Sequence, residues 1–191
     1  MTRRPKSSHA NRGKVAEQAI ERIHAGYSAA GHYCQRNPTP YKVIGTAPTL
    51  AAPGALRVVP ERDGPPDWLV VARGRAWLLD VKSEEGMRFH LAGIPQHQAQ
   101  AFDRWEQQGD TFRAGIVAVL DHGAVVAWLP WSWLGHRWWR WWASERAAVG
   151  TASLSPEEVS PWRCGWDWLP IAEEMSMREE GKIDGRWRIP F

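Results

Sequence analysis

The chain contains few of the features that mark secreted, zinc-binding or membrane-embedded proteins. Its two cysteines, Cys34 and Cys164, lie far apart in the sequence and form no Cys-x-x-Cys pair, which argues against a disulfide scaffold or a zinc module. No apolar run approaches the roughly 18 residues of a membrane-spanning helix. The first residues are polar and basic, unlike a signal peptide. We therefore expect a cytoplasmic protein with no membrane partner.

The chain also lacks a large net charge: the formal net charge of its 191 residues is only +3. The cations are unevenly placed, however, and five of them precede the first acidic residue: Arg3, Arg4, Lys6, Arg12 and Lys14. Such a basic arm suits contacts with DNA phosphates, although a solubilising terminus is the alternative. Arg73 and Arg75, further along the chain, are candidates to extend this positive surface.

The most informative segment is a predicted β-hairpin with acidic residues at its open end. Asp67 opens the apolar run 68–72, Arg73-Gly74-Arg75 favours a tight turn, and residues 76–82 return as an antiparallel strand. Side chains alternate faces along a strand, so Asp80 and Lys82 point to the same side. Two carboxylates and one ammonium group should therefore converge at one end of a small sheet.

This arrangement fits a magnesium-dependent phosphodiesterase. Carboxylate oxygens are the ligands that Mg²⁺ prefers, and the ion usually takes only one or two of them, here Asp67 and Asp80, with the Val81 carbonyl as a further ligand. Mn²⁺ is expected to substitute. Lys82 could orient or deprotonate a water and offset charge on a phosphate. The simpler interpretation is a pair of charged residues that only face solvent.

Two predicted helices flank the hairpin. The first spans residues 11–31 and carries Glu17 near its start, where the carboxylate could reach a metal on the sheet or simply be solvated. Its expected buried stripe consists of Val15, Ala19, Ile20, Ile23, Tyr27 and Ala30. The second helix spans about residues 94–108, and Gln98 could face the site while Phe102, one turn later, packs into the core. His97 has no second ligand at metal-binding spacing and is not expected to bind one.

The remaining pattern predicts an α/β fold with a mixed sheet. Strands are expected at 114–120 and 124–129, and two shorter ones at 41–44 and 56–59, which would form a hairpin or an irregular surface loop. We divide the chain into a flexible basic arm (1–10), a main domain (11–148) and a C-terminal extension (149–191). Within the extension, the acidic end is expected to pack back as an amphipathic helix.

Tryptophan is unusually frequent, with 14 residues, and most of them follow residue 104. A predicted helix from about residue 131 to 148 contains Trp138-Trp139-Arg140-Trp141-Trp142. These rings cover most sides of the helix, so we favour burial in the core or in a dimer interface. The alternative is stacking on bases of an opened DNA junction, worth about 1–3 kcal/mol per base.

The motifs together resemble those of RecU-type Holliday-junction resolvases, a family within the PD-(D/E)xK nuclease superfamily. The resemblance covers roughly residues 10–135 and rests on these segments, in this order: Asn11-Arg12-Gly13 with Glu17, Asn37-Pro38-Thr39-Pro40, Pro66-Asp67, Asp80-Val81-Lys82 and His97-Gln98.

The resemblance implies a restriction-endonuclease-like sheet flanked by helices, with a protruding stalk at about residues 40–62. It also implies a homodimer, Mg²⁺ dependence and paired symmetric cuts in four-way DNA junctions. Asp67, Asp80 and Glu17 would then be metal ligands, Lys82 the catalytic lysine and Gln98 a helix residue beside the site. The segment between Pro40 and Pro66 departs from a DNA-wedging stalk, because it is rich in proline, glycine and alanine rather than lysine.

Two alternatives remain open at this level. The first is a restriction-like or DNA-repair endonuclease on the same scaffold. The second is a non-catalytic junction-binding protein that has kept the fold.

Overall fold

Five strands form a mixed sheet in the computed structural model, which describes residues 9–38, 41–46, 56–60, 64–144 and 152–180. In spatial order they are β1 (Tyr33–Arg36), β4 (Trp68–Ala72), β5 (Arg75–Ser83), β7 (Phe112–Leu120) and β8 (Val125–Pro130). β5 and β7 run parallel and the other neighbours are antiparallel. The predicted α/β class and mixed sheet are therefore confirmed, whereas β1 was not predicted.

The central hairpin has the predicted turn. Arg73 and Gly74 have φ angles of 47° and 78°, so both adopt the left-handed conformation that suits a two-residue hairpin connection. Trp68 pairs with Leu79 and Ala72 with Arg75, which sets the register of β4 against β5. Continuing that register by one residue places Asp67 opposite Asp80.

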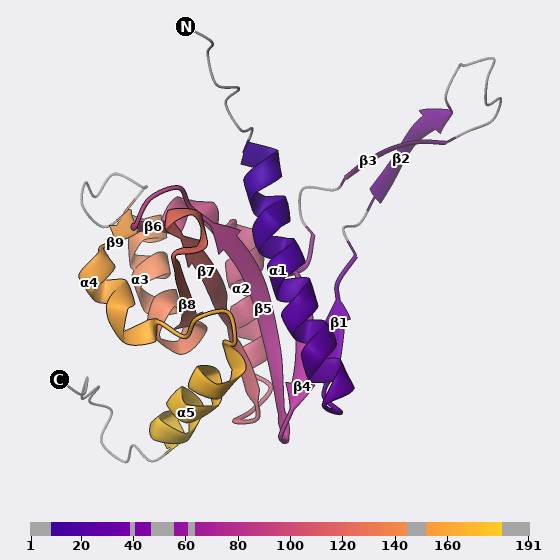
Figure 1. Cartoon of the computed structure of the whole chain (residues 1–191). Helices are drawn as coiled ribbons and strands as arrows, with labels where there is room; N and C mark the ends of the chain where they lie inside the picture. The colour runs from indigo at the N-terminus through magenta and orange to yellow at the C-terminus, as the bar shows by residue number, and fades with distance from the viewer. Residues whose placement is uncertain (1–8, 39–40, 47–55, 61–63, 145–151, 181–191) are drawn as a thin grey trace, which may run out of the picture.

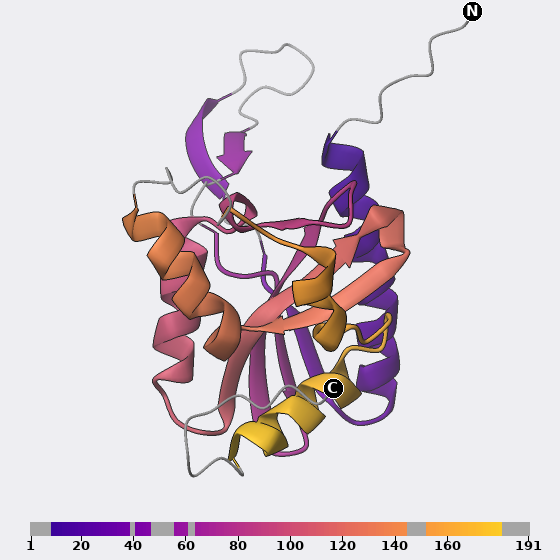
Figure 2. The same cartoon turned by 90° about the vertical axis from the view of Figure 1, so that its left-hand side faces the viewer.

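Helices cover both faces of the sheet (Figures 1 and 2). α1 (His9–Ala29) and α5 (Leu169–Glu180) pack on one face. α2 (Gln96–Glu106) and α3 (Trp131–Ala143) pack on the other, and α2 provides the crossover between the parallel strands β5 and β7. Shorter elements complete the described chain: β6 (Phe89–His90), η1 (Leu91–Gly93), η2 (Asp121–Gly123), β9 (Ser153–Leu154), α4 (Pro156–Val159) and η3 (Ser160–Trp162).

The buried stripe of α1 is rotated from the predicted one. Ala16, Ile20 and His24 are buried, whereas Val15 is 65% exposed. Ala30 is also exposed and lies just after the helix. The prediction missed His24 because a polar residue does not count toward an apolar stripe, although the i, i+4, i+8 spacing of the three buried residues is helical.

A second, two-stranded hairpin projects away from the five-stranded sheet (Figures 1 and 2). β2 (Tyr41–Thr46) pairs antiparallel with β3 (Leu56–Pro60). Both predicted strands are thus confirmed, and residues 47–55 between them lie outside the described part of the chain. The chain enters β4 from this hairpin, so the hairpin emerges beside the end of the sheet where Asp67 lies.

The tryptophans of α3 belong to the core. Trp131, Trp138 and Trp141 are buried, while Trp133, Trp139 and Trp142 are half-buried and pack on the same cluster. Asp103 of α2 accepts hydrogen bonds from the indole nitrogens of Trp131 (2.6 Å) and Trp139 (2.7 Å). These contacts favour the core interpretation over base stacking. α3 ends at Ala143, and the last predicted helical residues, 145–148, lie outside the described residues.

The C-terminal extension packs back on the domain, as predicted. Trp168, just before α5, is fully buried and stacks on Trp128 of β8, with ring centroids 5.1 Å apart. Its indole nitrogen donates to His24 Nε2 at 3.1 Å. Burial lowers the pKa of His24 to about 4, so this imidazole is neutral at pH 7. Among the described helices, none is both long and apolar enough to cross a bilayer.

Candidate active site

The two aspartates of the sequence motif meet on the face of the sheet that α2 covers. Asp80 lies on β5, the middle strand of the sheet, and only 1% of its surface is exposed. Asp67 immediately precedes β4, and its Oδ2 accepts a hydrogen bond of 2.9 Å from the backbone N–H of Val81. This bond ties the start of one strand of the hairpin to the end of the other.

Lys82 and Gln98 complete a closed polar cluster around Asp80. Lys82 Nζ lies 2.6 Å from Asp80 Oδ2 and donates to Gln98 Oε1 at 3.0 Å. Gln98 Nε2 donates to Asp80 Oδ1 at 2.7 Å. The predicted placement of Gln98 towards the site, with Phe102 in the core one turn later, is confirmed. The amide thus fixes both the carboxylate and the ammonium group.

Asn37 is a site residue that reasoning from the sequence did not single out. Its side-chain nitrogen donates to the Pro66 carbonyl at 2.7 Å, and its backbone N–H donates to the Asp67 carbonyl, also at 2.7 Å. Two hydrogen bonds therefore hold the Pro66-Asp67 peptide at the end of β1. The signal was present, because Asn37 stands in the Asn-Pro-Thr-Pro motif, but its role depends on β1, which was not predicted.

The electrostatics of the site favour an added cation. Burial and the neighbouring Asp80 carboxylate raise the pKa of Asp67 to about 6. Burial also raises the pKa of Asp80, although Lys82 opposes this shift. Both shifts mean that two negative charges are costly here, and a divalent cation between them would offset that cost.

Glu17 lies apart from the two aspartates and forms an ion pair with Arg36 at the end of β1. Within the described residues, no group of three or more His, Cys, Asp or Glu side chains gathers at metal-binding distance. The Arg36 charge opposes the rise in the pKa of Asp67 that burial and Asp80 cause. In this structure Glu17 therefore pairs with Arg36 instead of joining Asp67 and Asp80 as a third carboxylate.

The donor set nevertheless fits Mg²⁺. Two carboxylates provide hard oxygen atoms, and Mg²⁺ commonly takes only one or two carboxylates while keeping several waters. The Val81 N–H donates to Asp67 Oδ2, so the backbone that carries the predicted Val81 carbonyl ligand lies beside this carboxylate. The site has no sulfur or imidazole donor among the residues described above, so a softer ion such as Zn²⁺ fits less well.

The predicted DNA-binding cations divide into two groups. Arg3, Arg4 and Lys6 lie outside the described residues, Arg12 is in α1 near its start, and Lys14 is exposed on the same helix. Arg73 and Arg75 lie at the turn of the β4–β5 hairpin, at the opposite end from Asp67 and Asp80, and Arg73 bonds to Glu173 of α5 at 2.6 Å.

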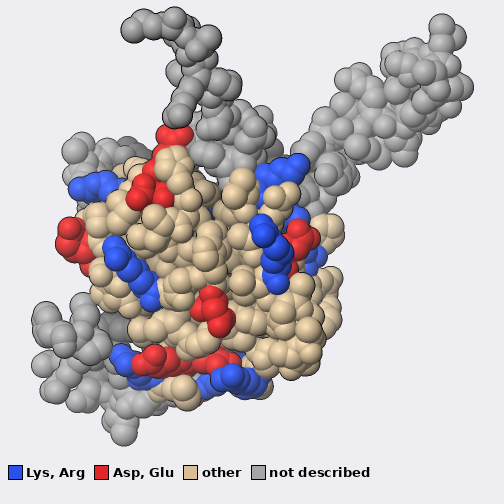
Figure 3. All heavy atoms as spheres, viewed as in Figure 1, with Lys and Arg blue, Asp and Glu red and all other residues tan. Residues whose placement is uncertain are grey.

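On the face drawn in Figure 3, the described Lys and Arg side chains are interspersed with acidic side chains rather than joined in one positive patch. Because Arg73 and Arg75 lie at the turn, the structure does not bring them together with Asp67 and Asp80. Comparison with known proteins returned no matching family model and no matching curated protein.

Proposed function

We propose that this protein is a Mg²⁺-dependent endodeoxyribonuclease with a restriction-endonuclease-like fold that cuts four-way DNA junctions. The observation that carries the proposal is the hydrogen-bonded cluster of Asp67, Asp80, Lys82 and Gln98 on the central hairpin. Charged residues that only face solvent would not need Asp80 to be buried. They would also not need an amide, here Gln98, that bonds to both Asp80 and Lys82.

The residues divide the chemistry between them. Asp67 and Asp80, with the Val81 carbonyl, would hold Mg²⁺, which when bound supplies Lewis-acid polarisation of the scissile phosphate. The Lys82 side chain is 22% exposed, so its Nζ can donate to an entering water or phosphate oxygen. Gln98 orients the Lys82 ammonium group and the Asp80 carboxylate through one hydrogen bond to each. Asn37 positions Asp67 through its hydrogen bond to the Pro66 carbonyl.

The shape of the molecule supports a DNA substrate larger than a simple duplex end. The β2–β3 hairpin and the start of α1 both project from the same side of the domain in Figures 1 and 2. Lys14 is exposed near the start of α1. This side therefore offers DNA a protruding element and a basic helix start next to the end of the sheet that carries Asp67. Phosphate contacts would supply affinity, and junction shape would supply selectivity.

A homodimer follows from the same proposal. A four-way junction presents two equivalent strands related by a two-fold axis, and a symmetric dimer presents two catalytic centres with the same symmetry. Sedimentation of the protein alone and with junction DNA would measure this directly.

The test is cleavage of matched synthetic substrates: a mobile four-way junction, a linear duplex and a flap, each with Mg²⁺, Mn²⁺ or chelator. We expect paired symmetric cuts in the junction, dependence on the divalent ion and much slower cutting of the duplex. Equal rates on all three substrates would reduce the proposal to an endonuclease without junction selectivity. Binding without any cleavage would favour a non-catalytic junction-binding protein.

A further inference from the structure

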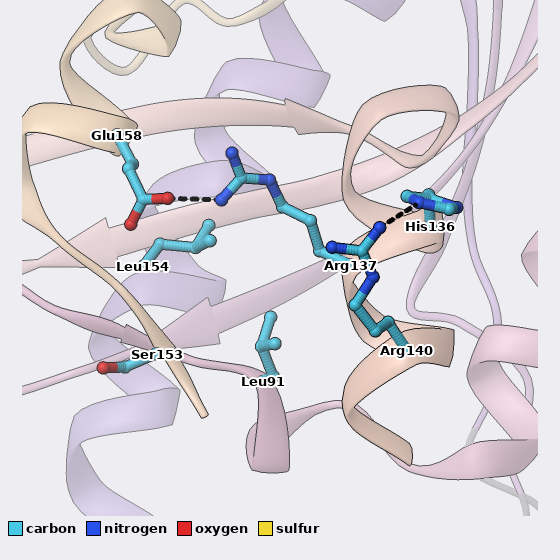
Figure 4. A pocket seen from close by; sticks show the side chains of 7 residues that line it. All are labelled: Leu91, His136, Arg137, Arg140, Ser153, Leu154 and Glu158. Atoms are coloured by element: carbon cyan, nitrogen blue, oxygen red, sulfur yellow. Dashed lines mark hydrogen bonds and ion pairs between the residues drawn. The ribbon is translucent and has the colours of Figure 1, made fainter. Parts of the chain in front are cut away.

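A second polar site lies on the outer side of α3, away from the carboxylate cluster. A cavity of about 400 Å³ opens between α3, β9 and the start of α4, and it shares no lining residue with the Asp67–Asp80–Lys82 cluster. Figure 4 shows Arg137 of α3 reaching across it to Glu158, while the Arg140 guanidinium turns to His136 on the same helix. Its volume is within the range of small-molecule sites, which is roughly 300–1,000 Å³.

Cationic groups dominate the polar lining. His136, Arg137 and Arg140 all come from α3, and Glu158 is the one acidic side chain among the described residues that line the cavity. The Glu158 carboxylate is already used twice, because it pairs with Arg137 and also accepts from the backbone N–H of Ser155 in the cap of α4. Glu158 therefore balances Arg137 and leaves Arg140 as excess positive charge.

Arg140 is the group best placed to meet an anion. Its Nη2 donates to His136 Nε2 at 3.0 Å, and among the described residues no carboxylate pairs with it. A guanidinium has five N–H donors, so most of those on Arg140 are not used by the described residues and can meet a ligand. His136 accepts this bond through Nε2, which leaves its Nδ1–H as a further donor.

The rest of the lining is preorganised. The Arg137 guanidinium lies over the Trp133 ring, with 4.6 Å from Cζ to the ring centroid, so its position is fixed from two sides. Ser153 contributes a hydroxyl, which accepts from Arg88 at 3.5 Å and can donate its own proton to a ligand. Leu91 and Leu154 also line the cavity, but both are buried and contribute only a small apolar part of its wall, which we call the apolar floor.

We propose that this cavity binds a phosphate monoester of nucleotide size. Arg140, Arg137 and the Ser153 hydroxyl would hold the phosphate, because guanidinium groups match its oxygen atoms bidentately. The apolar floor would take the sugar or base, which a site for inorganic phosphate alone would not need. Two sources present this chemistry, a free nucleoside monophosphate and the phosphorylated 5′ end of a DNA strand. The proposal is independent of the nuclease activity.

Binding is best measured by calorimetry in chelator, so that no cleavage occurs, with thymidine 5′-monophosphate as the probe and thymidine as its phosphate-free counterpart. We expect saturable binding of the monophosphate only. Arg140→Gln should weaken it about tenfold, the loss of one charge-assisted contact. Arg178→Gln, which changes an exposed arginine on α5, is the matched control and should bind as the wild type does.

Further measurements distinguish the free monophosphate from the phosphorylated strand end and control for misfolded variants. An oligonucleotide with a 5′-phosphate that binds more tightly than both its 5′-hydroxyl form and the free monophosphate identifies the strand end as the source. Ser153→Ala removes one donor with little change in packing, so it tests the site even if Arg140→Gln fails to fold. Equal affinity for thymidine and its monophosphate, or wild-type affinity in both cavity variants, would overturn the proposal. Asp80→Asn should bind the monophosphate normally, whatever its effect on DNA cleavage.

Discussion

The two ends of the β4–β5 hairpin carry similar numbers of charged residues, but these residues differ in their exposure to solvent and in their partners. At the turn, the Arg73 side chain is 67% exposed and reaches sideways to Glu173 of α5. At the open end, Asp80 is 1% exposed and bonds to Lys82 and Gln98. Solvent screens the exposed Arg73 guanidinium, whereas burial strengthens the interactions of Asp80. Position in the sheet, rather than residue type, therefore decides which charges can do chemistry.

The largest effect should follow from Asp80→Asn, which removes a carboxylate from the buried end without changing its shape. We expect junction cleavage to fall by about 10²–10³-fold if Asp80 is a metal ligand, as proposed. Gel-shift titration should show junction binding within about twofold of the wild type, on the expectation that phosphate contacts elsewhere supply most of the affinity. Asp110→Asn, in an exposed turn, is the matched control. Loss of binding together with loss of cleavage would point to a structural role for Asp80.

Lys82→Met should damage both activity and stability. Without the ammonium group, the Asp80 carboxylate is buried beside Asp67 with no cation, and we expect a loss of about 2–3 kcal/mol of unfolding free energy at pH 7. The variant raises the pKa of Asp80 further above its unfolded value. The deficit should therefore shrink as the pH falls below about 4, because the carboxyl then becomes protonated in the unfolded state as well as in the folded one. Urea unfolding at several pH values measures this; a deficit that is constant with pH would contradict the ion-pair explanation.

Asp67→Asn should change how stability depends on pH. The folded-state pKa of Asp67, about 6, lies above its ordinary value of 3.8, so this group lowers stability as the pH rises from about 4 through 6. The asparagine variant should therefore gain stability relative to the wild type at pH 7, and the gain should shrink as the pH falls to about 4 and vanish below it.

Mg²⁺ provides the complementary measurement on Asp67. The ion should raise the melting temperature of the wild type at pH 7 but raise that of Asp67→Asn much less, because ligands that bind only the folded state stabilise it. Equal Mg²⁺ responses in the two proteins would contradict metal binding at Asp67.

Arg73→Gln, at the other end of the hairpin, should have the smallest effect. Glu173 is buried and loses its partner, but the arginine itself is largely exposed, so we expect a loss of about 1 kcal/mol or less. Cleavage and junction affinity should stay within about twofold of the wild type. A large loss of junction affinity would restore Arg73 as a DNA contact and remove the contrast between the two ends.

Much of the central fold follows from local patterns in the sequence. The two apolar runs around Arg73-Gly74 predict β4 and β5, and the alternation along β5 places Asp80 and Lys82 on one face. The spacing of Gln98 and Phe102 on a helix predicts which of the two faces the site. These features could be predicted because each depends on a periodicity within a few residues.

The features that were missed depend on contacts distant in sequence. β1 is a polar edge strand that is recognisable only by its pairing with β4. His24 is buried because Trp168 donates to it from 144 residues away, and no local apolar pattern marks that contact. The pairing of Glu17 with Arg36 likewise depends on how α1 lies against β1, which helical periodicity does not reveal.

The stacking of Trp168 on Trp128 makes the docking of the C-terminal segment visible by spectroscopy. Two indoles 5.1 Å apart and 25° from parallel should give an excitonic band in circular dichroism. Trp138 and Trp142, 5.0 Å apart and inclined by 14°, form a second stacked pair wholly within α3. Replacing Trp168 by phenylalanine would remove one excitonic contribution and keep the other, so undocking of this segment could be followed separately from unfolding of the domain.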